Sequence, residues 1–138
     1  MTPEQIELVQ NSWKKVEPIS VMAAELFYSK LFELNPDYKN LFKEDMTKQG
    51  RKLMDMINMV VNSLAYPEAI LPAIKSSGKR HAHYGVEDSD YDVVGEAFIW
   101  TLRIGLGNDF TDEVKQAWIE AYTFLSKTMK DAAATIAA

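Results

Sequence analysis

The protein has two histidines, His81 and His83, and both lie in the stretch GKRHAHYGV. Residues two positions apart on an α-helix project about 200° apart around its axis, so the two imidazoles cannot bind one metal ion if this stretch is helical. The residues three, four and seven positions before His81 share its helix face; they are Gly78, Ser77 and Ile74. We therefore expect His81 to point into the protein and His83 to point outward.

A single inward histidine limits the chemistry available to this segment. A structural zinc site needs four ligands, and with no cysteine in the chain it would have to be built almost wholly from carboxylates. A haem needs only one axial imidazole from the protein, because the porphyrin supplies four nitrogens. The alternative is that His81 is a core histidine with satisfied hydrogen bonds and no ligand. The spacing alone leaves both interpretations open.

Composition and charge exclude several classes of function. The 138 residues, 47% hydrophobic and 25% charged, predict a single domain over residues 1–138. No apolar run approaches the roughly 20 residues of a membrane span, and the N-terminus lacks the pattern of a secretory signal. The net charge is −5, without a dense basic tract for binding nucleic acid. We expect a cytoplasmic protein that binds neither nucleic acid nor membrane, in keeping with its lack of cysteine.

The first part of the chain is predicted to form helices, which position these residues. The opening TPEQ supplies a capping hydroxyl, a proline at the first helical position and a glutamine at the third. Pro18 separates this helix from a second one, expected at about residues 20–34. Asn35 and Pro36 then open a short helical piece that ends near Phe42.

Helical spacing continues through the second part of the chain, and no segment alternates as a strand would. After a polar loop at residues 43–48 we expect a helix that breaks near Pro67, followed by a shorter helix that carries the histidines. Ser89 is expected to cap the next helix, which ends at residues 105–107, and Thr111 the last. The sequence therefore predicts an all-α fold.

Six segments, in this order along nearly the whole chain, resemble a known family: LFYSKLF, LF, QGRKLM, GKRHAHYGV, YDVVGEAF and AWIEAY. Together they resemble the globins, especially single-domain bacterial haemoglobins, the haem domain of flavohaemoglobins, and neuroglobin. The resemblance implies the globin fold, a three-over-three helical sandwich around haem b (iron protoporphyrin IX). It also implies that the protein is most simply a monomer that binds dioxygen, carbon monoxide and nitric oxide.

The resemblance assigns roles on the proximal side and in the walls of the haem pocket. His81 matches the proximal ligand of the haem iron, and its ring N–H is expected to donate to the backbone carbonyl of Ser77, one turn back. Phe42 matches the corner phenylalanine that stacks on the haem, and Leu53 matches the apolar distal wall. Both would also suit an ordinary core. His83 has no matched role.

Tyr28 and Gln49 match the tyrosine and glutamine on the ligand side of bacterial globins. Dioxygen on ferrous iron becomes partly anionic, so an aimed O–H or N–H stabilises it, whereas carbon monoxide gains much less. Because neuroglobin-like proteins have a histidine where Gln49 stands, we expect an open ferrous site with high oxygen affinity. The alternatives without a ligand are that Tyr28 is an ordinary core tyrosine and Gln49 a surface glutamine. Lys52, and with weaker support Arg51, are candidates for contacts with haem propionates or for a solvated charged face.

Reversible dioxygen binding, for storage, delivery or scavenging, is the leading hypothesis, and nitric oxide dioxygenation is the second. No flavin- or nicotinamide-binding unit follows the last predicted helix, so the second function is expected to need a separate reductase. In flavohaemoglobins a tyrosine and a glutamate support the proximal histidine; Tyr91 matches the tyrosine, but Ala133 stands at the glutamate's position. This departure disfavours peroxidase-like O–O cleavage and leaves a purely structural role open for Tyr91. The third hypothesis is a haem-based sensor that acts through a partner.

Overall fold

The computed structural model describes residues 1–42 and 45–137, and within these ranges the regular structure is helical, with no strand. Six α-helices lie in the described part of the chain: α1 Pro3–Val16, α2 Ser20–Leu34, α3 Met46–Asn62, α4 Leu71–His83, α5 Asp88–Leu106 and α6 Asp112–Ala137. Short 3₁₀ segments join them: η1 Glu17–Ile19, η2 Pro36–Leu41, η3 Pro67–Ala69 and η4 Gly107–Asp109. The prediction of an all-α fold is confirmed.

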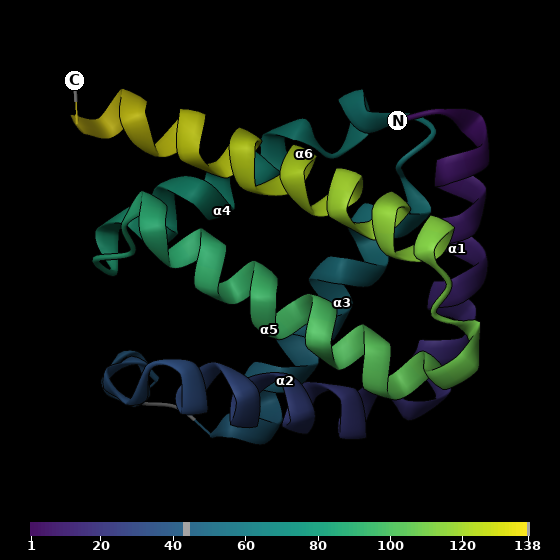
Figure 1. Cartoon of the computed structure of the whole chain (residues 1–138). Coiled ribbons are helices and arrows are strands. Elements are labelled where there is room, and N and C mark those ends of the chain that lie inside the picture. Colours follow the sequence, from purple (N-terminus) through teal and green to yellow (C-terminus); the bar gives the residue numbers. More distant parts are fainter. Residues whose placement is uncertain (43–44, 138) are drawn as a thin grey trace.

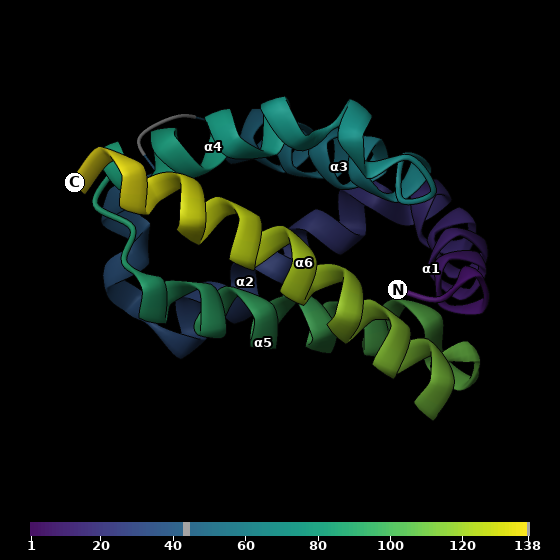
Figure 2. The same ribbon diagram turned by 90° about the horizontal axis from the view of Figure 1, so that it is seen from above.

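The helices stack across one another rather than forming a parallel bundle (Figure 1). α4 packs along α6, and α2 packs against both α5 and α3. Seen from above, α3 and α4 lie on one side and α2 and α5 on the other, with α1 at the end (Figure 2). The helix that carries both histidines is therefore held mainly by the C-terminal helix.

Two tryptophans join the N-terminal and C-terminal helices at the centre of the core. The rings of Trp13 and Trp118 lie 6.0 Å apart between centroids, and each is 2% exposed. Both indole N–H groups are satisfied, because Trp13 donates to Asn58 Oδ1 at 3.0 Å and Trp118 donates to Ser12 Oγ at 2.8 Å. These bonds tie α1 to α3 and to α6, so burying the two rings leaves no indole donor unpaired.

A glycine sets the spacing between α4 and α6. A Cβ added at Gly78 would lie 2.5 Å from the carbonyl oxygen of Met129 and 2.7 Å from its Cα. Only a residue without a side chain lets the two backbones approach this closely. Because Gly78 lies in the same helix as His81, this contact also positions the histidine.

Two predicted boundaries are wrong. Ser89 does not cap α5: the helix begins at Asp88, and the carboxylate of Asp90 accepts from the backbone N–H of Glu87 at 2.8 Å, so Glu87 is the capping position. The polar loop is shorter than expected, because Asp45 caps α3 and the helix begins at Met46. The rest of the predicted loop, residues 43 and 44, lies outside the described residues. Across the described ranges, no helix is both long and apolar enough to cross a bilayer.

Candidate functional site

His81 sits on the inner side of the last turns of α4 and is half-buried, whereas His83 is exposed. The expected inward and outward orientations are therefore confirmed. Nδ1 of His81 lies 2.6 Å from the carbonyl oxygen of Ser77. Because a carbonyl oxygen can only accept, Nδ1 carries the proton, and Nε2 of the neutral ring holds the free lone pair. The expected hydrogen bond is confirmed, and ligation of iron by Nε2 stays a prediction.

The chain turns sharply just after His81. Gly85 has φ +90°, a conformation that favours glycine, and the amide of Val86 donates to the carbonyl of His81 at 3.0 Å. The ring of Tyr84 lies edge-on to the imidazole, with 6.3 Å between centroids. Tyr84 itself is 64% exposed, so the rings of His81 and Tyr84 link the interior of the protein to its surface.

Tyr28 and Gln49 are brought together from α2 and α3. Tyr28 is 7% exposed, and Nε2 of Gln49 donates to its hydroxyl oxygen at 3.2 Å. Burial raises the pKa of Tyr28, and the hydrogen bond from Gln49 lowers it by less. The phenol therefore stays protonated at neutral pH. Because its oxygen accepts from Gln49, its own O–H remains available as a donor.

Two phenylalanine rings pack against the ring of Tyr28. The ring of Phe42 meets the ring of Tyr28 edge-on, with 5.3 Å between centroids, and Phe32 lies 5.9 Å from Tyr28 and 5.6 Å from Phe42. Phe42 is half-buried at the end of η2. The structure thus gathers Tyr28, Gln49 and Phe42 into one cluster, in which the ring of Tyr28 contacts the phenylalanines and its hydroxyl contacts Gln49.

The other predicted residues of α3 lie outside this contact cluster. Leu53 is half-buried and packs against the hydrophobic core one turn after Gln49. Lys52 and Arg51 are both exposed. Their placement suits a solvated surface as well as contacts at the edge of a bound cofactor.

Tyr91 is buried at the start of α5. Burial raises its pKa, and the nearby carboxylates of Asp88 and Asp90 raise it further. The ammonium of Lys130 lies 5.6 Å from the centroid of the Tyr91 ring. Among the described residues the Tyr91 hydroxyl has no hydrogen-bond partner, and Ala133 is half-buried on α6. The structural role left open for Tyr91 therefore stays open.

Sequence reasoning missed a hydrogen bond that joins η2 to the start of α5. The hydroxyl of Tyr38, which is 8% exposed, donates to Asp90 Oδ1 at 2.6 Å. Burial, and then Asp90, raise the pKa of Tyr38 to about 12. The carboxylate of Asp90 also accepts from the backbone N–H of Glu87. It therefore connects η2, which precedes Phe42, to the turn that follows α4. The partners are 52 residues apart, and no local spacing pattern reveals such a pair.

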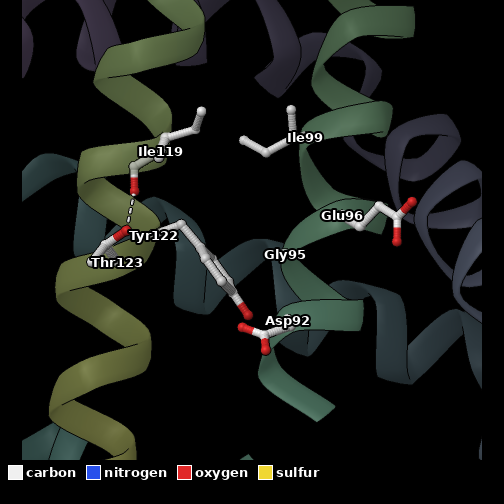
Figure 3. A pocket seen from close by; sticks show the side chains of 7 residues that line it. All are labelled: Asp92, Gly95, Glu96, Ile99, Ile119, Tyr122 and Thr123. Atoms are coloured by element: carbon white, nitrogen blue, oxygen red, sulfur yellow. Dashed lines mark hydrogen bonds between the residues drawn. The ribbon is translucent and has the colours of Figure 1, made fainter. Parts of the chain in front are cut away.

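A shallow open depression lies elsewhere, between α5 and α6 (Figure 3). None of the predicted site residues lines it. Its lining is Asp92, Gly95, Glu96, Ile99, Ile119, Tyr122 and Thr123. The Tyr122 ring fills the space beside Gly95, and its hydroxyl donates to the carbonyl of Tyr91 at 2.5 Å. We find no group of side chains here that would do chemistry.

Comparison with known proteins gives the family. The globin family model matches residues 25–129, well over half of the chain. Neuroglobin-2 of Oncorhynchus mykiss is 27% identical over 94% of this chain and 90% of its own length. A flavohemoprotein of Bacillus thuringiensis subsp. konkukian is 30% identical over 88% of this chain, which spans about a third of that protein (31%). Among solved structures, an engineered carbene transferase from Rhodothermus marinus that carries the name of a nitric oxide dioxygenase is 29% identical. It covers 99% of this chain and 95% of its own, with a TM-score of 0.89. The chain therefore belongs to the globin family and has the predicted globin fold.

Proposed function

We propose that this globin binds haem b through Nε2 of His81 and binds dioxygen reversibly and tightly at the ferrous iron. Haem would supply an iron, already bound by the porphyrin, that can take up a diatomic gas. The donor set suits this group, since one half-buried imidazole has its Nδ1–H held by Ser77 and its Nε2 lone pair free. A carbonyl partner of this kind fixes the tautomer and the orientation of a ligating histidine.

The hydrogen bond between Gln49 and Tyr28 is the observation that carries the proposal for dioxygen. It orders the two polar groups: the Gln49 amide donates to the Tyr28 oxygen, which leaves the Tyr28 proton for the gas ligand. Accepting a hydrogen bond makes a hydroxyl a better donor. We therefore infer that Tyr28 is the direct donor, and that Gln49 acts mainly by orienting and polarising it.

The remaining predicted residues have supporting roles in this proposal. Phe42 and Leu53 form apolar walls that exclude water, and Lys52 and Arg51 lie on the exposed side of α3, where they can meet the propionates. Carbon monoxide, which draws little electron density, gains less from the Tyr28 donor than dioxygen does. We also propose that the protein acts in the cytoplasm as a monomer.

Nitric oxide dioxygenation is the second candidate, because the flavohemoproteins and the Rhodothermus marinus protein resemble this chain over most of its length. Each turnover would consume one electron, which we propose comes from a separate reductase. The lack of a carboxylate at Ala133 leaves His81 without a strong acceptor beyond Ser77. We therefore expect less electron release towards the iron than an acidic partner would give.

The order of the two donors can be tested through oxygen release. Tyr28→Phe should speed dioxygen dissociation about tenfold, which corresponds to a hydrogen bond of about 1.4 kcal/mol, and Gln49→Leu should speed it by about threefold. Carbon monoxide dissociation should change little in either variant. Stopped-flow displacement of dioxygen by carbon monoxide gives these rates.

Matched controls use residues of the same types on the surface. Tyr66→Phe, at a tyrosine 74% exposed, and Gln116→Leu, at an exposed glutamine, should leave the dioxygen rate unchanged. Unchanged release in both Tyr28→Phe and Gln49→Leu would refute the donor mechanism. A larger effect of Gln49→Leu would reverse the proposed order. Rapid catalytic loss of nitric oxide with a supplied reductase would favour the second function.

A further inference from the structure

The outer face of α4 gathers positive charge on an acidic protein. The chain carries a net charge of −5, yet it has no acidic residue between Glu68 and Glu87. Within that gap lie Lys75, Lys79 and Arg80, besides the two histidines. The sign of the charge around the histidine helix is therefore opposite to that of the whole chain.

Lys75, Lys79 and Arg80 are directed to solvent, and within residues 1–42 and 45–137 no carboxylate pairs with them. Lys75, Lys79, Arg80 and His83 are all exposed. Within the described part of the chain, the ion pairs involve other lysines, and none of these four residues meets a carboxylate. The guanidinium of Arg80 donates to the hydroxyl of Ser76 at 2.9 Å, and this neutral partner does not compensate its charge.

An exposed aromatic ring lies beside the cations. Lys75, Lys79 and His83 follow one another at intervals of four residues and so form a row along α4. Arg80 begins the next row, which continues to Tyr84, four residues later. Exposed tyrosine and arginine side by side are typical of protein interfaces. We call Lys75, Lys79, Arg80, His83 and Tyr84 together the basic face.

The neighbouring helix extends this charge. Gly78 brings α4 into backbone contact with Met129 of α6. The adjoining turns of α6 carry Lys127, which is exposed, and Lys130, which is half-buried, with one carboxylate, Asp131. These two lysines add positive charge on α6, whereas two carboxylates, Glu87 and Asp88, follow Tyr84 at the start of α5.

We propose that the basic face docks the acidic surface of a one-electron carrier protein that reduces the haem iron. This inference rests on the proposed ligation of haem by His81, whose ring lies 6.3 Å from that of Tyr84. One electron passes from the reduced carrier to ferric iron; the carrier is oxidised by one electron, the iron becomes ferrous, and no bond forms or breaks. Docking here would bring the carrier to the exposed ring of Tyr84, which lies beside the imidazole of His81.

A protein partner fits better than a nucleic acid or a membrane. Three full charges on one helix are too few for tight binding to a phosphate backbone, and fewer than the roughly 4–8 basic residues typical of sites for anionic lipid. A small, polar, salt-sensitive contact is typical of transient redox complexes. The exposed ring of Tyr84 adds apolar area to such a contact.

The test compares two triple variants of equal net charge. Lys75→Gln/Lys79→Gln/Arg80→Gln removes three cations from the basic face. The matched control, Lys14→Gln/Arg103→Gln/Lys115→Gln, removes three exposed cations from α1, α5 and α6. Each variant is loaded with haem, and its Soret band is checked before any further measurement.

The probe is reduced flavodoxin, a small acidic flavoprotein, and the readout is the second-order rate of reduction of the ferric protein. At low ionic strength the basic-face variant should react about tenfold more slowly than the wild type, and the control should change much less. The rates should converge at high salt. Photoreduced riboflavin, an uncharged reductant, should reduce all three proteins equally. The dissociation constant for oxidised flavodoxin, measured without turnover, should rise in the same variant.

An equal slowing of both triple variants would overturn the proposal, because net charge alone would then explain it. A basic-face variant with unchanged rate and affinity would also overturn it. Preferential binding to phosphatidylglycerol vesicles, or self-association that the basic-face variant abolishes, would assign the face to a membrane or to a second copy instead. Absence of a Soret band would contradict the proposed function, and the flavodoxin affinities of the two haem-free variants would still show whether the face binds an acidic protein.

Discussion

Replacing Gly78 by alanine should destabilise the protein, although the same change stabilises most helix interiors. Gly78 lies within α4, where alanine is favoured over glycine by about 1 kcal/mol. The new Cβ would lie 2.5 Å from the Met129 carbonyl oxygen and 2.7 Å from its Cα. Both contacts involve backbone, so no side chain can move aside and the two helices must separate.

The expected magnitude follows from these two opposing effects. Overpacking a close contact costs about 1–3 kcal/mol, and a clash with backbone on a second helix belongs at the upper end. After subtracting the gain in helix propensity, the net loss in the free energy of unfolding should be about 2 kcal/mol. The matched control is Gly105→Ala in α5, where the added Cβ would lie 3.6 Å from Ile19 Cδ1, an ordinary contact. Gly105→Ala should stabilise by up to about 1 kcal/mol.

Urea unfolding followed by far-ultraviolet circular dichroism measures both variants under the same conditions. We expect Gly78→Ala to be less stable than the wild type and Gly105→Ala to be at least as stable. Equal or greater stability of Gly78→Ala would refute the close approach of α4 to α6, and with it the proposed positioning of His81 by α6.

Three further outcomes follow from other contacts. Tyr38→Phe removes the hydrogen bond to the Asp90 carboxylate and should lower the free energy of unfolding by about 1–2 kcal/mol in urea titrations at pH 7; no change would mean that the bond contributes nothing. Because the pKa of Tyr38 is raised to about 12, its stabilising contribution is complete below pH 10 and is lost as pH rises towards 12, so the decline in stability should be shallower in Tyr38→Phe. Equal slopes would argue against this linkage. Ser12→Ala leaves the buried indole N–H of Trp118 unpaired and should cost about 1–3 kcal/mol, measured by tryptophan fluorescence in urea, whereas a neutral effect would show that water replaces the hydroxyl.

Local rules predicted most of the helices because their signals lie within a few residues of one another. The capping box of Thr2 and Gln5 and the break at Pro18 are of this kind, and both are present. The prediction for Ser89 failed although it is also local. The carboxylate of Asp90 holds the Glu87 amide, so the helix starts before Ser89.

In the candidate site, too, the features that depend on local spacing were predicted, and the contacts between distant helices were not. Helical periodicity predicted the orientation of His81 and its separation from His83, since both depend only on position within α4. Tyr28 and Gln49 lie on two different helices. Only the resemblance to globins predicted that both side chains would act on the same bound gas. The Tyr38–Asp90 bond and the contact of Gly78 with Met129 depend on how distant helices cross. Periodicity in a single sequence carries no information about such crossings.

The whole proposal depends on a haem held by His81 with an open position for dioxygen. The decisive measurement is the visible absorption spectrum of the purified, haem-supplemented protein, recorded in the ferric state, after reduction without oxygen, and after exposure to oxygen. We predict a Soret band, a broad unsplit visible band on reduction, and two bands after oxygenation. A protein without a Soret band would contradict the claim and return His81 to the role of a core histidine, and a sharply split reduced spectrum would contradict the open site.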